Sequence, residues 1–286
     1  MPGIKVVGIM AKPGIPKASA IMRELVEWLQ SRGVAARLDH EAARYLDKPG
    51  MPRVEVPEGT ELLIVLGGDG TLLSGARAVG GREIPILAVN LGGLGFLTSI
   101  TVDQLYPELE RALNSEQRTI PRRMLHGDLV RDGKIVKSYE ALNDIVIAKT
   151  EIARMIEVEA SVDGQYLSVY KADGLIVATP TGSTAYSLSA GGPIVLPAVE
   201  ALCITPVCPH MLTNRPVLVP DTSLIEIVCR AGDNDAFLTV DGQVGELLMQ
   251  DDHIVCRRSE HSVHLIRPPK MFFFDVLREK LKWGER

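Results

Sequence analysis

The sequence lacks any long hydrophobic run. Hydrophobic residues make up 46% of its 286 positions, yet no uninterrupted apolar stretch approaches the roughly 20 residues that span a bilayer. Near the start, Gly8 and Pro13 interrupt a short apolar run, and no small-residue cleavage site follows a long apolar core. No secretion signal is visible. We therefore expect a soluble, cytoplasmic protein without a membrane partner.

The sequence also lacks an excess of charge of one sign. Charged residues make up 23% of the chain and the net charge is -5. Proteins that bind nucleic acids or anionic membranes usually carry a basic patch or stripe. We therefore expect no nucleic-acid partner.

Cysteine is scarce. None of Cys203, Cys208, Cys229 and Cys256 falls in a C-x-x-C pair, a usage typical of a reducing compartment. Cys203, Cys208 and His210 lie close together in the sequence, but their spacing matches no zinc pattern. Buried thiols are the better interpretation.

Length and hydrophobic pattern together predict two domains, because 286 residues exceed the size at which one core usually stops growing. Residues 1–100 alternate short apolar runs with helical stretches, which predicts an open, mostly parallel α/β sheet domain. Residues 101–267 carry period-2 segments, which predict a β-sandwich-like domain. Residues 268–286 have helical spacing, and we expect them to pack back on the first domain. The turn signals of the β-rich part are Asp132-Gly133, Asp163-Gly164 and Asp241-Gly242.

The most distinctive motif is Gly67-Gly68-Asp69-Gly70-Thr71, between an expected strand and an expected helix. Glycines there let backbone N–H groups approach a phosphate, and a helix N-terminus favours negative charge. A carboxylate at Asp69 would repel phosphate unless it binds a metal ion or takes a proton from an attacking hydroxyl. The structural alternative is that Asp69 caps the helix. The stretch is no P-loop, because it lacks Gly-Lys-Ser/Thr, and as G-x-G-x-x-G it fails at Leu73.

Topology relates this motif to a second glycine loop, Asn90 to Gly95, which follows the next expected strand. Ligands of open α/β sheets bind at the carboxyl ends of the strands. We therefore expect both glycine loops to share one cleft.

A second group of polar residues lies in the β-rich half: Asn143-Asp144, Lys171 to Gly174 and Thr179 to Ser189. Carboxylates and amides accept hydrogen bonds from ribose hydroxyls and from base N–H groups, and Tyr186 offers a flat surface to a ring. Each residue has a structural alternative as a turn former, a helix cap or a core aromatic. Their concentration favours a nucleotide site.

With these motifs the sequence resembles the NAD kinase family. The match runs in the family's order through most of the chain. The Gly-Gly-Asp-Gly-Thr motif alone is also similar to lipid kinases and phosphofructokinases, whereas the run Thr179 to Tyr186 is highly specific. The matching segments are Gly67 to Leu73, Asn90 to Leu97, Asn143-Asp144, Asp173 to Pro193, Pro209 to Pro216 and Val240 to Gln243.

The resemblance implies an enzyme that uses ATP, with Mg²⁺ or another divalent metal, to phosphorylate the 2′-hydroxyl of the adenosine ribose of NAD. It implies that Asp69 is the general base, that residues 101–267 bind NAD, and that the chain forms a homodimer or homotetramer. The binding residues that it implies are Gly70, Leu73, Phe96, Asn143, Asp144, Arg154, Lys171, Asp173, Thr184, Ala185, Tyr186, Ser187, Leu188, Ser189 and Gln243.

Some points stay open. Asp144 stands where many relatives have Glu, so the ribose geometry and the choice between NAD and NADH are undecided. Arg154 and Lys171 either neutralise phosphate charge or are solvated surface charges. The alternative functions are another kinase with the same glycine loop, acting on a lipid or sugar phosphate, and a non-catalytic NAD(P) sensor.

Overall fold

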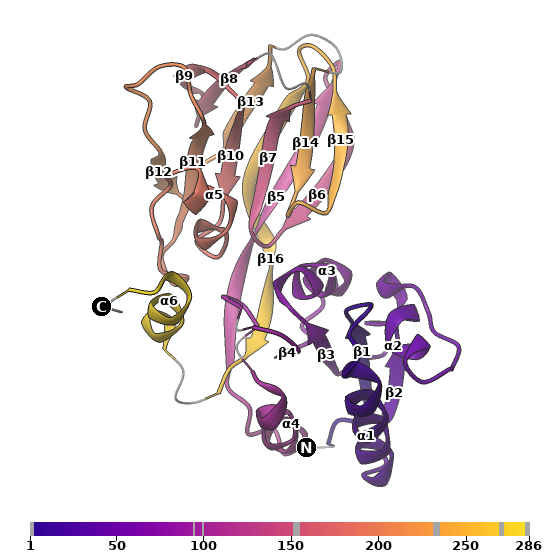
Figure 1. The fold of residues 1–286 in the computed structure, drawn as a ribbon. Coiled ribbons are helices and arrows are strands. Elements are labelled where there is room, and N and C mark those ends of the chain that lie inside the picture. Colours follow the sequence, from indigo (N-terminus) through magenta and orange to yellow (C-terminus); the bar gives the residue numbers. More distant parts are fainter. Residues whose placement is uncertain are drawn as a thin grey trace. The chain divides into compact units, whose positions relative to one another are not determined.

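The structure is a computed structural model that describes residues 3–93, 95–98, 100–150, 155–230, 235–268 and 272–283. The chain forms two compact units, Met1–Pro121 with Val263–Arg286, and Arg122–Ser262. It passes from one unit to the other within strands β5 (Thr119–Arg131) and β16 (His253–Ile266) (Figure 1). In the part of the chain that the structure describes, no helix has both the length and the apolar character that crossing a membrane requires.

The first unit contains a parallel sheet in the order β2-β1-β3-β4, and the end of β16 pairs with β4. All six residues of β3 are buried, as expected for a strand whose sheet is covered on both faces. The strands are β1 (Val6–Ala11), β2 (Ala35–Leu38), β3 (Leu62–Gly67) and β4 (Ile86–Asn90). The helices are α1 (Ala18–Ser31), α2 (His40–Arg44), η1 (Arg53–Glu55), α3 (Asp69–Val79), η2 (Val102–Gln104), α4 (Leu105–Leu113) and α6 (Phe273–Leu281).

The second unit is built from two antiparallel layers. One sheet has the order β12-β11-β10-β7-β14-β15, and the other layer contains the pairs β5-β6, β13-β16, β13-β8 and β8-β9 (Figure 1). One apolar core contains residues of both layers, among them Ile147, Leu175, Val158 and Ile227. The predicted fold class, an α/β domain plus a β-sandwich-like domain, is therefore confirmed.

The remaining elements of the second unit are mostly short strands. They are β6 (Lys134–Ala141), β7 (Asp144–Lys149), β8 (Ile156–Val162), β9 (Gln165–Ala172), β10 (Gly174–Ala178), η3 (Gly182–Thr184), α5 (Tyr186–Ser189), β11 (Ala201–Val207), β12 (Val217–Pro220), β13 (Ile225–Cys229), β14 (Ala236–Val240) and β15 (Val244–Leu248). Each Asp-Gly pair that the sequence marks as a turn joins two strands and has positive φ at both residues, for example 51° at Asp132 and 71° at Gly133. Positive φ at both central positions is the conformation of tight hairpin turns.

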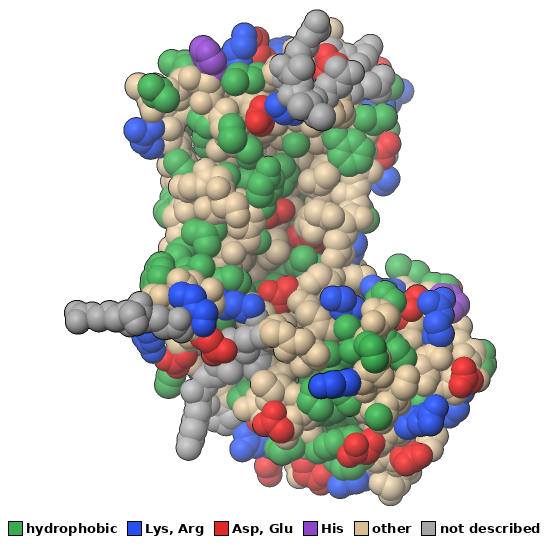
Figure 2. Space-filling view, in the orientation of Figure 1, with side chains coloured by type: hydrophobic (Ala, Val, Ile, Leu, Met, Phe, Trp, Pro, Cys, Tyr) green, Lys and Arg blue, Asp and Glu red, His purple; other side chains and the backbone are tan. Residues whose placement is uncertain are grey.

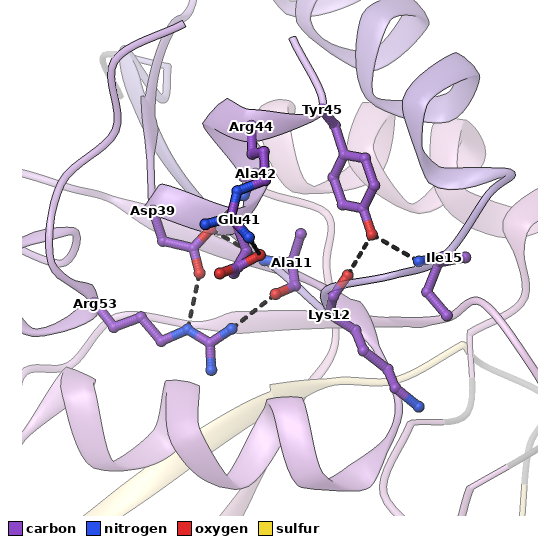
Figure 3. Close-up of polar contacts among 9 residues, drawn as sticks. All are labelled: Ala11, Lys12, Ile15, Asp39, Glu41, Ala42, Arg44, Tyr45 and Arg53. Carbon is purple, nitrogen blue, oxygen red and sulfur yellow. Dashed lines mark hydrogen bonds and ion pairs between the residues drawn. The ribbon is translucent and has the colours of Figure 1, made fainter. Parts of the chain in front are cut away.

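An ion pair between the buried Asp39 and the partly buried Arg53 fixes the carboxyl end of β1 in the first unit (Figure 3). The carboxylate of Asp39 accepts hydrogen bonds from the amides of Ala11 at 3.3 Å and Ala42 at 2.7 Å, and from Nε of Arg53 at 2.8 Å. Arg53 also donates to the carbonyl of Ala11 at 2.7 Å and to the hydroxyl of Ser74 at 3.0 Å. Since Ser74 belongs to α3, the pair ties β1 to the helix that follows the glycine motif.

Asp39→Ala is expected to lower the free energy of unfolding by about 3 kcal/mol, because it leaves Nε of Arg53 and two buried backbone amides without their acceptor and removes the counter-ion of the guanidinium. The matched control is Glu41→Ala, at a residue that Figure 3 also shows. Glu41 pairs at 3.0 Å with Arg44, whose side chain is 74% exposed, and exposed pairs contribute less than about 1 kcal/mol. Urea unfolding measures both variants, and equal losses would contradict the role given to Asp39.

Charges of both signs are interspersed on the visible surface of the first unit (Figure 2). That face therefore presents no single-sign electrostatic field.

Candidate active site

The glycine motif lies at the junction of β3 and α3. Gly67 is the last residue of β3, and Gly68 is the N-cap of α3 in an extended conformation, with φ -122° and ψ -169°. Asp69 is the first residue of the helix, so it does not occupy the N-cap position that the structural alternative requires. Its carboxylate is held by the other glycine loop instead.

The loop after β4 supplies four hydrogen bonds to the Asp69 carboxylate. The amide of Phe96 donates to Oδ2 at 2.9 Å. The amides of Leu97 and Thr98 donate to Oδ1 at 3.2 and 3.0 Å, and the Thr98 hydroxyl donates to the same oxygen at 2.9 Å. The two glycine loops thus meet at the carboxyl ends of neighbouring parallel strands, where a ligand site of this fold class is expected.

A pocket of about 290 Å³ lies in the second unit. Four of its lining residues, Asn143, Asp144, Ala185 and Tyr186, are among those that the family resemblance implies. Tyr186 is 45% exposed, which excludes its interpretation as a core aromatic. The other lining residues are Val146, Thr239, Asp241 and Gly242.

The hydroxyl-rich loop is packed directly against the Asn-Asp pair. The amide of Thr179 donates to the carbonyl of Asn143 at 2.9 Å, and the Thr179 hydroxyl donates to the carbonyl of Leu142 at 2.6 Å. A Cβ at Gly182 would lie 2.0 Å from the carbonyl oxygen of Asn143. Only glycine allows this approach, so residue 182 serves to bring the two segments together.

Asp241 orders the same pair from the other side. Its carboxylate accepts hydrogen bonds from the amides of Leu142 at 3.1 Å, Asn143 at 2.7 Å and Asp144 at 3.3 Å. From the sequence, Asp241 is predicted only to be a turn residue and lies within a family-like segment. A turn-forming aspartate in an Asp-Gly hairpin does not reveal its distant acceptor role, because the hydrogen bonds span roughly a hundred residues along the chain.

Burial changes the acidity of Asp144. Its side chain lies in the pocket and only 4% of the residue is exposed. Desolvation, together with the negative charge of Asp241, raises the pKa of Asp144 to about 7. Near neutral pH the group therefore exists in both protonation states, and it can donate a hydrogen bond as well as accept one.

The raised pKa of Asp144 predicts a pH-dependent stability. From about pH 4 to about pH 7 the folded chain holds a proton that the unfolded chain has released, so stability falls as pH rises through this window. Asp144→Asn removes the titrating group. The wild type should lose stability as the pH rises, and the variant should not. The difference in melting temperature, variant minus wild type, is therefore expected to increase by a few degrees between about pH 5 and pH 8. A difference that does not change with pH would contradict the assignment.

The other binding residues that the family resemblance implies differ in burial and in their partners. Asp173 forms an ion pair with Lys149 at 2.6 Å, and Lys171 pairs with Glu157 at 3.4 Å with 56% of its side chain exposed. Ser187 is fully buried, and its hydroxyl lies within hydrogen-bond distance, 2.9 Å, of the Thr205 hydroxyl. Its surroundings are those of a residue packed inside the second unit. Arg154 lies outside the described residues.

The remaining binding residues that the family resemblance implies lie in helices and loops. In the first unit these are Gly70 and the buried Leu73 in α3, and the half-buried Phe96 in the loop after β4. In the second unit, Thr184 ends η3, Leu188 and Ser189 belong to α5, and Gln243 follows the pocket residue Gly242.

Two polar features bear on what the sites can hold. Oδ1 of Asn143 is buried and has no hydrogen-bond partner among the described residues, so this amide offers an acceptor to a ligand donor.

Over the described ranges, no group of three His, Cys, Asp or Glu side chains could hold a metal ion.

Two family models match the chain. The ATP-NAD kinase N-terminal domain matches residues 7–117, and the ATP-NAD kinase C-terminal domain matches residues 142–268. Among curated relatives, the NAD kinase of Solibacter usitatus is 58% identical over 287 residues that cover all of both chains. The NAD kinase of Geobacter metallireducens is 48% identical over 283 residues, 99% of this chain and all of the relative.

Solved structures show the same fold. The yeast NADH kinase complexed with NADH superposes with a TM-score of 0.91 and 29% identity, over 99% of this chain and 89% of that one. An NAD kinase from Archaeoglobus fulgidus in complex with ATP gives a TM-score of 0.77 and 26% identity, over 97% and 98% of the two chains.

The glycine turn with its carboxylate, the β-sandwich unit that follows it in the chain and the matches to relatives named as kinases together place the chain among the kinases, which are transferases of phosphoryl groups. The family models and the full-length relatives make the assignment specific. The chain belongs to the NAD kinase family.

Proposed function

We propose that the chain transfers the terminal phosphoryl group of ATP to the 2′-hydroxyl of the adenosine ribose of NAD, which gives NADP and ADP. The observation that carries the proposal is the Asp69 carboxylate at the glycine turn, fixed by the loop after β4. The support from relatives is that one solved structure is described in complex with ATP and another with NADH.

Asp69 is the proposed general base. It accepts the proton of the 2′-hydroxyl while the ribose oxygen forms a bond to the terminal phosphorus of ATP. The bond between this phosphorus and the bridging oxygen breaks, and ADP leaves with the electron pair. A divalent metal, Mg²⁺ in this proposal, supplies positive charge to the phosphates when it is bound. Gly70 and the neighbouring amides at the N-terminus of α3 would lie close to the transferred group.

The proposed contacts of the dinucleotide are the residues that the family resemblance implies. Asn143 and Asp144 would bind ribose hydroxyls or amide groups of NAD, and Tyr186 would stack against a ring. Lys171 and Arg154 would neutralise phosphate charge. The other proposed contacts are Leu73, Phe96, Asp173, Thr184, Ala185, Ser187, Leu188, Ser189 and Gln243. We further propose that residues 101–267 form the NAD-binding domain, and that the protein is a cytoplasmic homodimer or homotetramer.

A substrate panel tests the proposal. Purified protein is incubated with Mg²⁺, with ATP or polyphosphate as donor, and with NAD, NADH, a sugar phosphate or a diacylglycerol as acceptor. The expected result is NADP formation from NAD, read with an NADP-specific dehydrogenase. Phosphorylation of the lipid or sugar alone would establish another kinase, and NADP binding without ATP consumption would establish a sensor. Either result would contradict the proposal.

A further inference from the structure

The two oxygens of the Asp69 carboxylate have different surroundings. Oδ1 accepts from the amides of Leu97 and Thr98 and from the Thr98 hydroxyl. Among the described residues, Oδ2 accepts only from the amide of Phe96. A carboxylate oxygen offers about two lone-pair sites. Oδ1 is therefore saturated with donors, whereas Oδ2 keeps capacity for a further one.

The direction of the Thr98 hydroxyl is fixed by Asn90. Nδ2 of Asn90 lies 2.9 Å from Oγ1 of Thr98, and an amide NH₂ group donates but never accepts. The amide orientation is set in turn, because its oxygen accepts from the amide of Gly92 at 2.7 Å and its nitrogen donates to the carbonyl of Gly93 at 2.9 Å. The Thr98 hydroxyl already accepts from Asn90, so its single proton is directed to Asp69.

This chain of hydrogen bonds is shielded from water. Thr98 is fully buried and Asn90 is only 7% exposed, so no solvent molecule replaces the hydroxyl without a rearrangement. The amide of Gly95 donates to the carbonyl of Thr98 at 3.3 Å, which closes the turn around the carboxylate. Rotation of an aspartate carboxyl about its last torsion is otherwise broad, and the Asn90–Thr98 pair restricts it.

We propose that Thr98 is a positioning residue for phosphoryl transfer. Its hydroxyl, directed by Asn90, holds Oδ1 of Asp69 and leaves Oδ2 as the oxygen that receives the proton of the acceptor hydroxyl. This inference rests on the proposed function, in which Asp69 is the general base. Thr98 acts only through Asp69 and contacts no substrate in this scheme.

The test compares variants of the full-length enzyme in the NADP-forming assay. Thr98→Val removes the hydroxyl at nearly constant shape and is expected to lower kcat by about 10- to 100-fold, as a misplaced catalytic group does, with KM for ATP and NAD within about twofold. Thr98→Ser keeps the hydroxyl and should restore kcat to within about threefold of the wild type. Thr98→Ala serves as a second hydroxyl-free variant if the valine protein does not fold.

A matched control separates positioning from stability. Thr60 is also buried in the first unit, and its hydroxyl donates to the carbonyl of Val56 at 2.7 Å. Thr60→Val removes a buried hydroxyl of the same kind away from Asp69, so it should leave kcat of the folded protein unchanged.

A double-mutant cycle with Asp69→Asn then decides the mechanism, because residues that act as one unit show non-additive losses. Thr98→Val should change kcat by less than about twofold in the Asp69→Asn background. An equal fold-loss in both backgrounds, or wild-type kcat for Thr98→Val, would overturn the inference while leaving the proposed function standing. Wild-type kcat for Asp69→Asn alone would overturn the general base and this inference together.

Discussion

Asp69→Asn is expected to lower kcat for NADP formation by about 10²- to 10⁴-fold, the usual cost of losing a general base. An amide has no oxygen basic enough to take the proton of the acceptor hydroxyl. It also places an NH₂ group where Oδ2 now accepts from the amide of Phe96, so some loss of stability is expected as well. The measurement is kcat in the coupled assay, together with the dissociation constant for NAD by calorimetry.

The role of the carboxylate is separated from folding by two comparisons. The affinity for NAD should stay close to that of the wild type, since the proposed base acts in the transition state. Asp103→Asn makes the same chemical change at an exposed position of η2 and should leave turnover intact. Near-normal turnover for Asp69→Asn would rule out the general-base role.

Gly95→Ala is expected to lower kcat by about 10²-fold or more. A Cβ at this position would lie 2.1 Å from Oδ1 of Asp69 and 2.3 Å from Oγ1 of Thr98. Separations this short force the carboxylate or the loop to move, and displacement of a catalytic group by about 1 Å can cost 10²-fold in rate. The variant keeps every functional group, so a loss of kcat would show that the position of the carboxylate is essential.

Gly93 provides the matched control in the same loop. A Cβ at Gly93 would meet no atom within 4 Å, and Gly93 is not among the residues with positive φ. Gly93→Ala should therefore retain kcat within about twofold, with thermal unfolding measured for both variants. If the two alanine variants lost activity equally, the effect would come from loop flexibility and not from contact with Asp69.

The fold could be predicted from the sequence where local patterns carry the information. Alternation of apolar runs with helical stretches indicates the parallel sheet, and the Asp-Gly pairs indicate hairpins that the structure contains. Strands β7 and β10 are harder to predict, because all of β10 and the middle of β7 are short, continuous apolar runs and such a run has no diagnostic period. Their pairing with strands distant in the sequence decides their conformation.

The site could be predicted only as far as chemistry follows from residue type. Asp69 stands out because a carboxylate among phosphate-binding glycines needs a reason. Thr98 and Asn90 do not stand out, since a threonine and an asparagine near a turn have ordinary local roles. Their importance depends on a three-dimensional contact with a residue from another β-α segment. Asp241 was likewise hidden behind its role as a hairpin turn residue.

Transfer of the phosphoryl group can be observed directly at the phosphorus atoms during the reaction. Phosphorus NMR of the protein with Mg²⁺, ATP and NAD should show the terminal phosphate signal of ATP disappearing as the 2′-phosphate monoester of NADP appears, in a one-to-one ratio. Release of inorganic phosphate without the monoester, or a monoester on any other hydroxyl, would contradict the central claim.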